Sequence, residues 1–194
     1  MEELKPSIGR RGAIARAAAE LCEDGESIII NAGTTTFQMA EYLRHRRLLI
    51  LTNGFPMASE LIAPGRNRIV LPGGEIYREQ GIVLPPFDQD AIQYDTASRM
   101  FMSCYSISPF GIIEGDPPIA RAAAKLLCRA DKHIVMADSS KLEQRGSMAV
   151  RPLSRVHTLI TDDAAPTSAL DPVRQAGVNV VIVGVEENTV PSSA

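Results

Sequence analysis

The chain has 194 residues, 45% of them hydrophobic and 22% charged, with a formal net charge of −3. A chain of this length can bury a sizeable core, and we expect one domain over residues 1–194. Nucleic-acid binding depends on clustered basic charge, so 20 Lys and Arg against 23 Asp and Glu argue against direct contact with DNA or RNA. Three scattered cysteines favour a reducing cytoplasm over a disulfide framework or a cysteine zinc site. No apolar run is long enough to cross a bilayer, and no signal peptide opens the chain.

The first predicted elements lead to a turn rich in threonine. Apolar spacing predicts a helix over residues 8–22, and β-branched residues predict a buried parallel strand at 28–30. Gly33 permits a sharp turn, and the residues after it have helical spacing again from residue 37. The three residues between turn and helix are Thr34, Thr35 and Thr36.

These threonines occupy the start of a predicted helix, where backbone N–H groups have no intrahelical partner and the helix dipole is positive. With their hydroxyls, such amides form a natural cradle for an anion, most readily a phosphate. The alternative is that Thr34 or Thr35 only caps the helix, as threonine often does.

The next units repeat the pattern of a strand followed by a polar loop. A strand at 48–51 runs into Thr52, Asn53 and Gly54, and a helix is expected over 56–63. A strand at 68–71 then runs into a Pro-Gly-Gly loop that contains Gly73 and Gly74.

The rest of the chain continues with alternating elements. Residues 75–95 are less regular, with a short helix expected at 87–94, and residues 108–118 are expected to form a loop. Further strands are predicted at 99–103, 133–137, 158–161 and 178–183, and helices at 119–129 and 168–175. Alternating strands and helices indicate an α/β protein with a doubly wound, mostly parallel sheet, which binds ligands at the carboxyl ends of its strands.

Four loops are therefore expected on one edge of the sheet, at 33–36, 52–54, 72–74 and 138–141. They offer backbone amides, hydroxyls, one amide side chain, a carboxylate and an ammonium group, which suit a small phosphorylated polyol. Asp138 and Lys141 have ordinary alternatives, as a turn cap and as a solvated surface lysine. No catalytic residue, metal ligand or cofactor site is expected. The candidate effector-binding residues are Gly33, Thr34, Thr35, Thr36, Thr52, Asn53, Gly54, Gly73, Gly74, Asp138 and Lys141.

An ordered set of motifs resembles the C-terminal effector-binding domain of DeoR-type transcriptional repressors. The motifs are Ala-Gly-Thr-Thr-Thr at 32–36, Leu-Thr-Asn-Gly at 51–54, Pro-Gly-Gly at 72–74, Asp95, Gly111, Ala-Asp-Ser-Ser-Lys at 137–141 and Leu-Ile-Thr-Asp at 159–162. The resemblance implies the fold shared by ribose-5-phosphate isomerase and the coenzyme A transferases. It also implies a homo-oligomeric bacterial regulator of carbohydrate metabolism with a sugar phosphate as effector.

The same resemblance implies roles for individual residues. The effector's phosphate would meet Gly33, Thr34, Thr35 and Lys141, and its polyol part would meet Asn53, Gly73, Gly74 and Asp138. The spacing of the first two motifs is most similar to the branch of the family that senses ascorbate 6-phosphate.

Three features depart from the family pattern. Nothing before residue 8 could form the family's winged helix-turn-helix, so either the chain is trimmed to its sensor half, which we favour, or the protein has lost its DNA-binding domain. The family's Asp-x-Ala-Phe-x-Gly segment is Asp95-Thr-Ala-Ser-Arg-Met here. The helix after Pro117 lacks a glutamate near its start. The last two changes fall where a particular sugar would be sensed.

A sugar-phosphate isomerase on the same fold is the alternative function. It would use Asp138 or Glu75 as a general base beside the bound sugar. Its Gly-rich loop only partly meets the pattern of the isomerases, which pair an acid with a lysine, so we expect no enzyme.

Overall fold

The computed structural model describes residues 4–62, 65–84, 95–142 and 144–184, with side chains described from residue 9. The helices are α1 Leu4–Glu20, α2 Thr34–Phe37, α3 Met39–Leu43, α4 Phe55–Ile62, α5 Pro117–Leu127 and α6 Thr167–Gln175, with 3-10 turns η1 Ser139–Leu142 and η2 Leu153–Arg155. The strands of the main sheet are β1 Ser27–Ile30, β2 Leu49–Thr52, β3 Arg68–Val70, β6 Ala97–Met102, β9 Ala130–Met136, β11 Thr158–Asp162 and β12 Asn179–Val183. The shorter strands are β4 Glu75–Tyr77, β5 Ile82–Leu84, β7 Ser106–Ser108, β8 Gly111–Glu114 and β10 Met148–Arg151.

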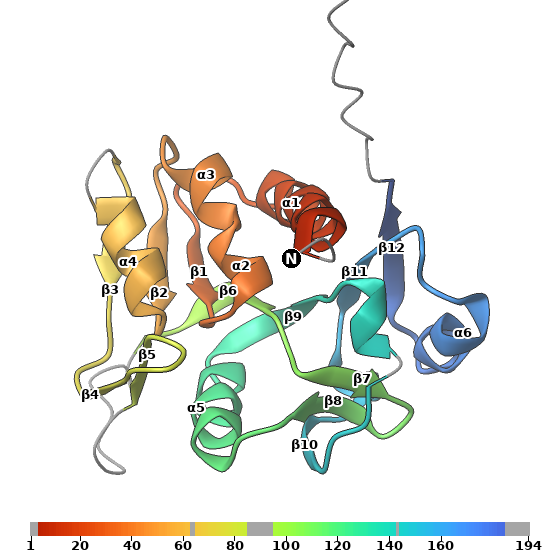
Figure 1. The fold of residues 1–194 in the computed structure, drawn as a ribbon. Coiled ribbons are helices and arrows are strands. Elements are labelled where there is room, and N and C mark those ends of the chain that lie inside the picture. The colour runs from red at the N-terminus through yellow and green to blue at the C-terminus, as the bar shows by residue number, and fades with distance from the viewer. Residues whose placement is uncertain (1–3, 63–64, 85–94, 143, 185–194) are drawn as a thin grey trace, which may run out of the picture.

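The main sheet has the order β12-β11-β9-β6-β1-β2-β3, and every neighbouring pair of its strands is parallel (Figure 1). Two small antiparallel sheets, β10-β8-β7 and β4-β5, accompany it. The predicted doubly wound, mostly parallel sheet is therefore confirmed.

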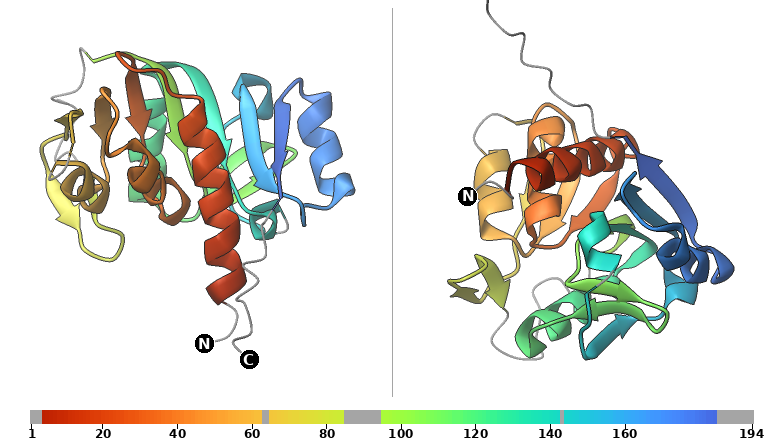
Figure 2. Two further views of the ribbon diagram at one scale, coloured as in Figure 1. Left: turned by 90° about the horizontal axis from the view of Figure 1, so that it is seen from above. Right: turned by 45° about the vertical axis from the view of Figure 1, so that its right-hand side comes forward.

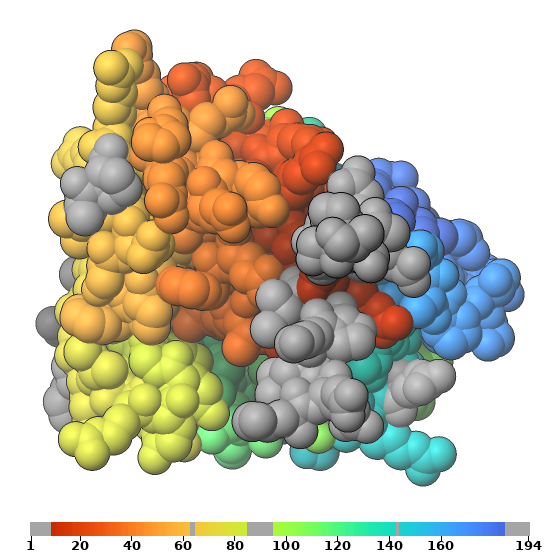
Figure 3. Space-filling view, turned by 45° about the horizontal axis from the view of Figure 1, so that its top comes forward, coloured from red at the N-terminus to blue at the C-terminus, as the bar shows by residue number. Residues whose placement is uncertain are grey.

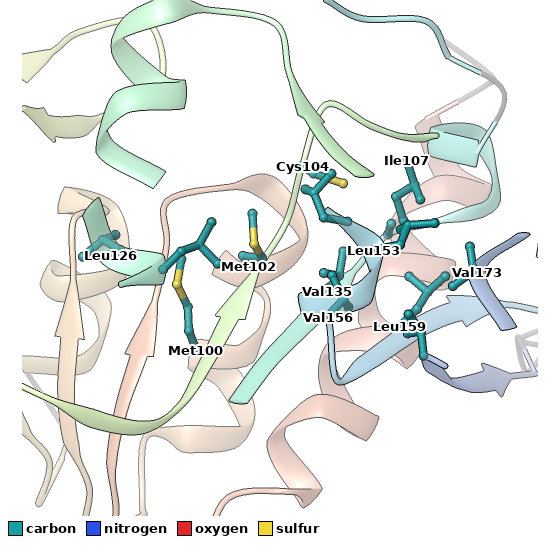
Figure 4. Close-up of a cluster of buried hydrophobic side chains, with 14 of the residues drawn as sticks. Met100, Met102, Cys104, Ile107, Leu126, Val135, Leu153, Val156, Leu159 and Val173 are labelled. Atoms are coloured by element: carbon teal, nitrogen blue, oxygen red, sulfur yellow. The ribbon is translucent and has the colours of Figure 1, made fainter. Parts of the chain in front are cut away.

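The sheet separates two layers of core, because successive side chains of a strand point to opposite faces. Ile28 and Ile30 of β1 pack with residues of α1, α3 and α4, whereas Ile29 packs on the other face. Met100 and Met102 of β6 share that second face with residues of α5 and α6, as the close-up shows (Figure 4). Seen from above, α1 to α4 lie on one side of the sheet and α5 lies on the other (Figure 2).

Several local predictions were wrong. The helix expected after the threonines is two short helices, α2 and α3, which meet at Gln38. Residues 75–84, expected to be irregular, form the β4-β5 hairpin, and the loop expected at 108–118 contains β8 and the start of α5. β10 was not predicted at all. The short helix expected at 87–94 lies outside the described residues.

The direction in which the chain adds strands to the sheet reverses between β1 and β6. From β1 the chain adds β2 and β3 on one side, and it then returns to add β6, β9, β11 and β12 on the other. In open α/β sheets, the loops that leave two such strands separate and form a crevice at their carboxyl ends. Along the part of the chain that the structure describes, no helix combines the length and the apolar composition needed to cross a membrane.

Candidate functional site

A cavity of about 800 Å³ opens at this point, at the carboxyl ends of β1, β2 and β6. Its walls come from the β1–α2 loop, α2 and α3, the start of α4, the β4-β5 hairpin, the segment after β6, the end of β8 and the start of α5. The lining includes Gly33, Thr34, Gly54, Ser103, Tyr105 and Glu114.

Asn31 ties the two diverging loops together at the base of the cavity. Its buried side chain accepts a hydrogen bond from the Ser103 backbone N–H at 3.0 Å and donates one to the Ser103 carbonyl at 3.2 Å. Gly33 lies against Ser103 so closely that a Cβ at Gly33 would come 1.8 Å from the Ser103 hydroxyl oxygen. The φ of Gly33 is 171°, an extended backbone that any residue adopts, so close approach is the reason for glycine here.

The three threonines differ in what their side chains do. Thr34 is exposed and lines the cavity. Thr35 is buried, with 3% of its surface exposed, and is not part of the lining. Thr36 is fully buried, and its hydroxyl donates to the carbonyl oxygens of Asn31 and Gly33 at 2.8 and 3.1 Å, which holds the turn.

Backbone amides at this turn have no acceptor among the described residues. The first N–H groups of a helix have no intrahelical acceptor, and the first backbone hydrogen bond here comes from Phe37 to the Gly33 carbonyl. Among the described residues, no hydrogen bond uses the N–H of Thr34 or Thr35. Since α2 has only one turn, an anion would be held by these individual amides rather than by a large helix dipole.

The loop after β2 supports the cavity more than it lines it. The Asn53 side-chain oxygen accepts a hydrogen bond from the Ala32 N–H at 2.8 Å, and the buried Thr52 hydroxyl accepts one from the Gly54 N–H at 3.0 Å. Asn53 also accepts a backbone hydrogen bond from Val83 at 2.8 Å, which fastens the β4-β5 hairpin beside the loop. Figure 3 shows this hairpin in yellow-green below the orange and yellow helices.

Tyr105 and Glu114 form the far wall of the cavity, and Lys141 lies against Tyr105. The Lys141 ammonium lies over the Tyr105 ring, 5.7 Å from its centre. The Tyr105 ring packs against Gly115, where an added Cβ would lie 3.1 Å from the ring. Glu114, at the end of β8, is 6% exposed, and burial raises its pKa to about 7 although the charge of Lys141 lowers it. Lys141 itself is not part of the lining but stands directly behind it.

Asp138, at the carboxyl end of β9, faces α1. Its carboxylate is 3.0 Å from the Arg11 guanidinium and accepts hydrogen bonds from the Ser140 N–H and hydroxyl. Burial raises the pKa of Asp138, but the Ser140 hydroxyl and the Arg11 guanidinium outweigh burial and hold the pKa below its usual range. The buried Asp162, one strand further, accepts a hydrogen bond from the Ser139 N–H at 2.6 Å and lies 3.7 Å from Arg10.

The structure thus divides the predicted site residues into groups. Gly33, Thr34 and Gly54 line the cavity. The next group is buried and is not part of the lining: Thr35, Thr36, Thr52, Asn53 and Asp138. Lys141 lies behind the wall, against Tyr105. Gly73 and Gly74 are exposed beyond β3 and do not line the cavity.

Most other residues of the cavity wall were not predicted from the sequence, among them Ser103, Tyr105 and Glu114. Ser103 and Tyr105 follow β6, and the rule that polar residues after a parallel strand mark a site would have found Ser103. Glu114 lies in a segment expected to be a loop, and nothing in the sequence indicates that its carboxyl group is buried.

A second cavity, of about 540 Å³, lies at the opposite, amino-terminal edge of the sheet. It is lined by polar side chains that include Asp131, His133 and Arg151. The buried His133 ring contacts the Arg155 and Leu127 carbonyls at 2.9 Å each. Among the described residues, no group of three or more His, Cys, Asp or Glu side chains is placed to hold a metal ion.

Comparison with known proteins identifies relatives among transcriptional regulators. The family described as the DeoR C-terminal sensor domain matches residues 7–163. The HTH-type transcriptional regulator UlaR of Shigella dysenteriae serotype 1 is 31% identical over 170 residues, which cover 88% of this chain and 67% of the regulator. UlaR of Escherichia coli K12 has the same identity and coverage. These relatives are regulators and not enzymes.

Solved structures share the fold at low sequence identity. A D-ribose-5-phosphate isomerase in complex with phospho-erythronic acid superposes with a TM-score of 0.50 and 15% identity over 68% of this chain. The β subunit of eIF2B from Chaetomium thermophilum superposes with a TM-score of 0.52 and 12% identity over 81% of this chain. The chain spans about half the length of either structure, 52% and 50%. The likeness to ribose-5-phosphate isomerase confirms the fold predicted from the sequence.

Proposed function

Because this chain belongs to the family of DeoR C-terminal sensor domains, we propose that its cavity binds a phosphorylated sugar that acts as the effector of a transcriptional regulator. The phosphate is held at the turn of Gly33 and Thr34, and the sugar hydroxyls extend toward Tyr105 and Glu114. Binding then changes the affinity for DNA of a separate N-terminal domain.

The observation that carries this proposal is the pair of unbonded amides beside an open cavity. The N–H groups of Thr34 and Thr35 form no hydrogen bond with any described residue, and the Thr34 side chain is exposed beside them. Backbone amides and a hydroxyl at the start of a helix suit a phosphate group. The cavity volume of about 800 Å³ falls within the range of small-molecule sites.

Lys141 supplies the positive charge that the lining lacks. The charged residues of the lining are Glu41, Glu79 and Glu114, all of them acidic, and Glu41 and Glu79 are exposed. A lysine ammonium binds phosphate as a flexible point charge, and the Lys141 side chain lies against Tyr105, which forms the wall. A movement of the lysine around this ring would bring its ammonium to the ligand.

Asp138 and Glu75, the bases considered for an isomerase, are in environments that do not suit catalysis. Asp138 is held by Arg11 and Ser140, and Glu75 is exposed on β4, outside the lining. The regulators among the relatives agree with a binding role.

Calorimetric titration of this chain tests the proposal. The compounds are D-ribose 5-phosphate, D-fructose 6-phosphate and L-ascorbate 6-phosphate, and each is paired with its unphosphorylated counterpart. We expect at least one phosphorylated compound to bind, its counterpart to bind at least tenfold more weakly, and Thr34→Ala to weaken binding. The proposal is contradicted if none of the three binds.

Coupling to DNA requires two conformations of the full regulator, because an effector shifts an equilibrium only through unequal affinity for the two states. We propose that the regulator is a homo-oligomer, as the family resemblance implies. Light scattering of the chain with and without the bound compound measures its oligomeric state.

A further inference from the structure

Glu114 is a buried carboxyl group that lines the cavity and has no partner among the described residues. It ends β8, where its backbone is fixed by antiparallel pairing with Met148 of β10. Only 6% of the residue is exposed, and it forms part of the cavity lining. No hydrogen bond or ion pair joins its side chain to another described residue. A buried carboxyl group is normally satisfied by such a partner, so this one is available to a ligand.

Charged and titratable side chains face Glu114 from the elements that pack against it. Burial raises its pKa to about 7, the charge of Lys141 on η1 lowers it, and Asp116 before α5 raises it. Cys104 and Tyr105 complete the wall after β6, and Glu41 and Glu79 face the same cavity from α3 and the β4-β5 hairpin. A desolvated acid with specific charged neighbours in a cavity is typical of functional sites.

We propose that Glu114 binds the hydroxyl-bearing end of the effector as a neutral carboxylic acid, so that the effector carries a proton into the complex. This inference rests on the proposed function, since it concerns the same cavity. In its neutral form the group donates one hydrogen bond and accepts others, which matches the mixed donors and acceptors of a polyol.

The charges that the effector brings into the cavity favour the neutral form of Glu114. A phosphate monoester brings between one and two negative charges near pH 7, and nearby negative charge disfavours an ionised carboxylate. If Lys141 turns to the phosphate, it also ceases to stabilise an ionised Glu114. A ligand that excludes water from the cavity raises the pKa of Glu114 further. Each of these effects favours uptake of a proton.

Proton uptake predicts the sign of the pH dependence. The effector prefers the protonated Glu114, so affinity is highest below the pKa of the free group and falls as pH rises through and above about 7. The limiting slope is about tenfold in Kd per pH unit for one proton. The phosphate titrates near pH 6, so its ionisation affects the acidic side of the profile.

Calorimetry between pH 6 and 9 with the three phosphorylated compounds named above tests this inference. For each compound that binds, we expect Kd to rise above pH 7 in the wild-type protein and to stay nearly constant in Glu114→Gln, which copies the neutral acid. Glu75→Gln is the matched control, since it removes an exposed carboxylate outside the cavity lining, and it should keep the wild-type profile. Titrations in buffers of different ionisation enthalpy should show proton uptake in the wild type and none in Glu114→Gln.

The outcomes separate the two proposals. If no compound binds at any pH, the proposed function fails and this inference fails with it. If a compound binds with the same pH profile in wild type and Glu114→Gln, or without proton uptake, the inference alone is overturned. Carbon NMR of the carboxyl groups of the wild-type protein needs no variant, so a folding defect cannot affect the result. Glu114 should titrate near pH 7 when free and at higher pH when bound, and an ordinary carboxyl pKa in the complex contradicts the inference.

Discussion

Two loops in equivalent positions of the sheet differ in what covers them. The loop after β1, with Gly33 and Thr34, opens into the cavity. The loop after β9, with Asp138, is covered by α1, whose Arg11 pairs with that carboxylate. Both loops follow a buried parallel strand, and both carry polar residues typical of a ligand site. In this sheet, the carboxyl end of a strand is therefore open to a ligand only where no helix packs over it.

The largest effect is expected from closing the open loop with Gly33→Ala. The added methyl group would overlap the Ser103 hydroxyl, and overpacking of this kind costs about 1–3 kcal/mol. Binding of the phosphorylated compounds should fall more than a hundredfold in calorimetry. The double variant Gly33→Ala/Ser103→Gly makes room for the methyl group and should recover most of the affinity. Unchanged binding by Gly33→Ala would mean that the turn does not touch the ligand.

The covered loop is disrupted by Arg11→Ala, which leaves Asp138 buried without its cation. An unpaired buried charge is costly, but Arg11 is partly exposed, and we expect a loss of about 2 kcal/mol in the free energy of unfolding. Urea denaturation measures this loss. Arg16→Ala is the matched control on the same helix, because the Arg16–Glu20 pair is exposed and should contribute about 0.5 kcal/mol or less. Equal losses in the two variants would contradict the role given to Arg11.

Adjacent threonines distinguish binding from stability within the open loop. Thr36→Val removes the hydroxyl that donates to Asn31 and Gly33, and it should cost about 1–2 kcal/mol of stability. Thr34→Val removes an exposed hydroxyl at the cavity and should weaken binding several-fold while the melting temperature stays within about 1–2 °C of the wild type. Thermal melts and calorimetry of both variants check this, and a reversed pattern would exchange their roles.

The smallest effect is expected in the pH dependence of folding stability, through Asp138 in the covered loop. The pKa of Asp138 is lowered in the folded protein from its ordinary value of 3.8. Its contribution to stability is therefore fully present above that value and is lost as pH falls through the lowered folded pKa. Between pH 5 and 2 the wild type should lose more stability than Asp138→Asn, as measured by urea denaturation. Parallel curves for the two proteins would contradict the pairing with Arg11.

Sequence reasoning predicted the main sheet because its strands are short apolar runs between polar loops. Ile28, Ile29 and Ile30 are buried on both faces of the sheet, and such strands are recognisable without knowledge of their neighbours. The hairpins were missed because their strands have three or four residues and depend on tertiary packing. Gly111 illustrates this, since its φ of 136° and the Arg151 carbonyl oxygen, which would lie 2.1 Å from an added Cβ, are visible only in the folded chain.

The candidate site was predicted in part for a related reason. Parallel strands bring their following loops to one edge, so Gly33, Thr34 and Gly54 were found from position alone. Whether a residue on that edge faces a cavity or a helix depends on what packs opposite it, and the sequence does not contain that information locally. Asp138 shows this limit, because its partner Arg11 lies 127 positions away.

The central claim is that the cavity between the β1 and β6 loops binds a phosphorylated polyol. The most direct measurement is a map of backbone amide chemical shifts during titration with each of the three phosphorylated compounds. We expect the largest changes at Thr34, Thr35, Ser103 and Glu114. Changes that gather instead around His133 and Arg151, at the opposite edge of the sheet, would contradict it.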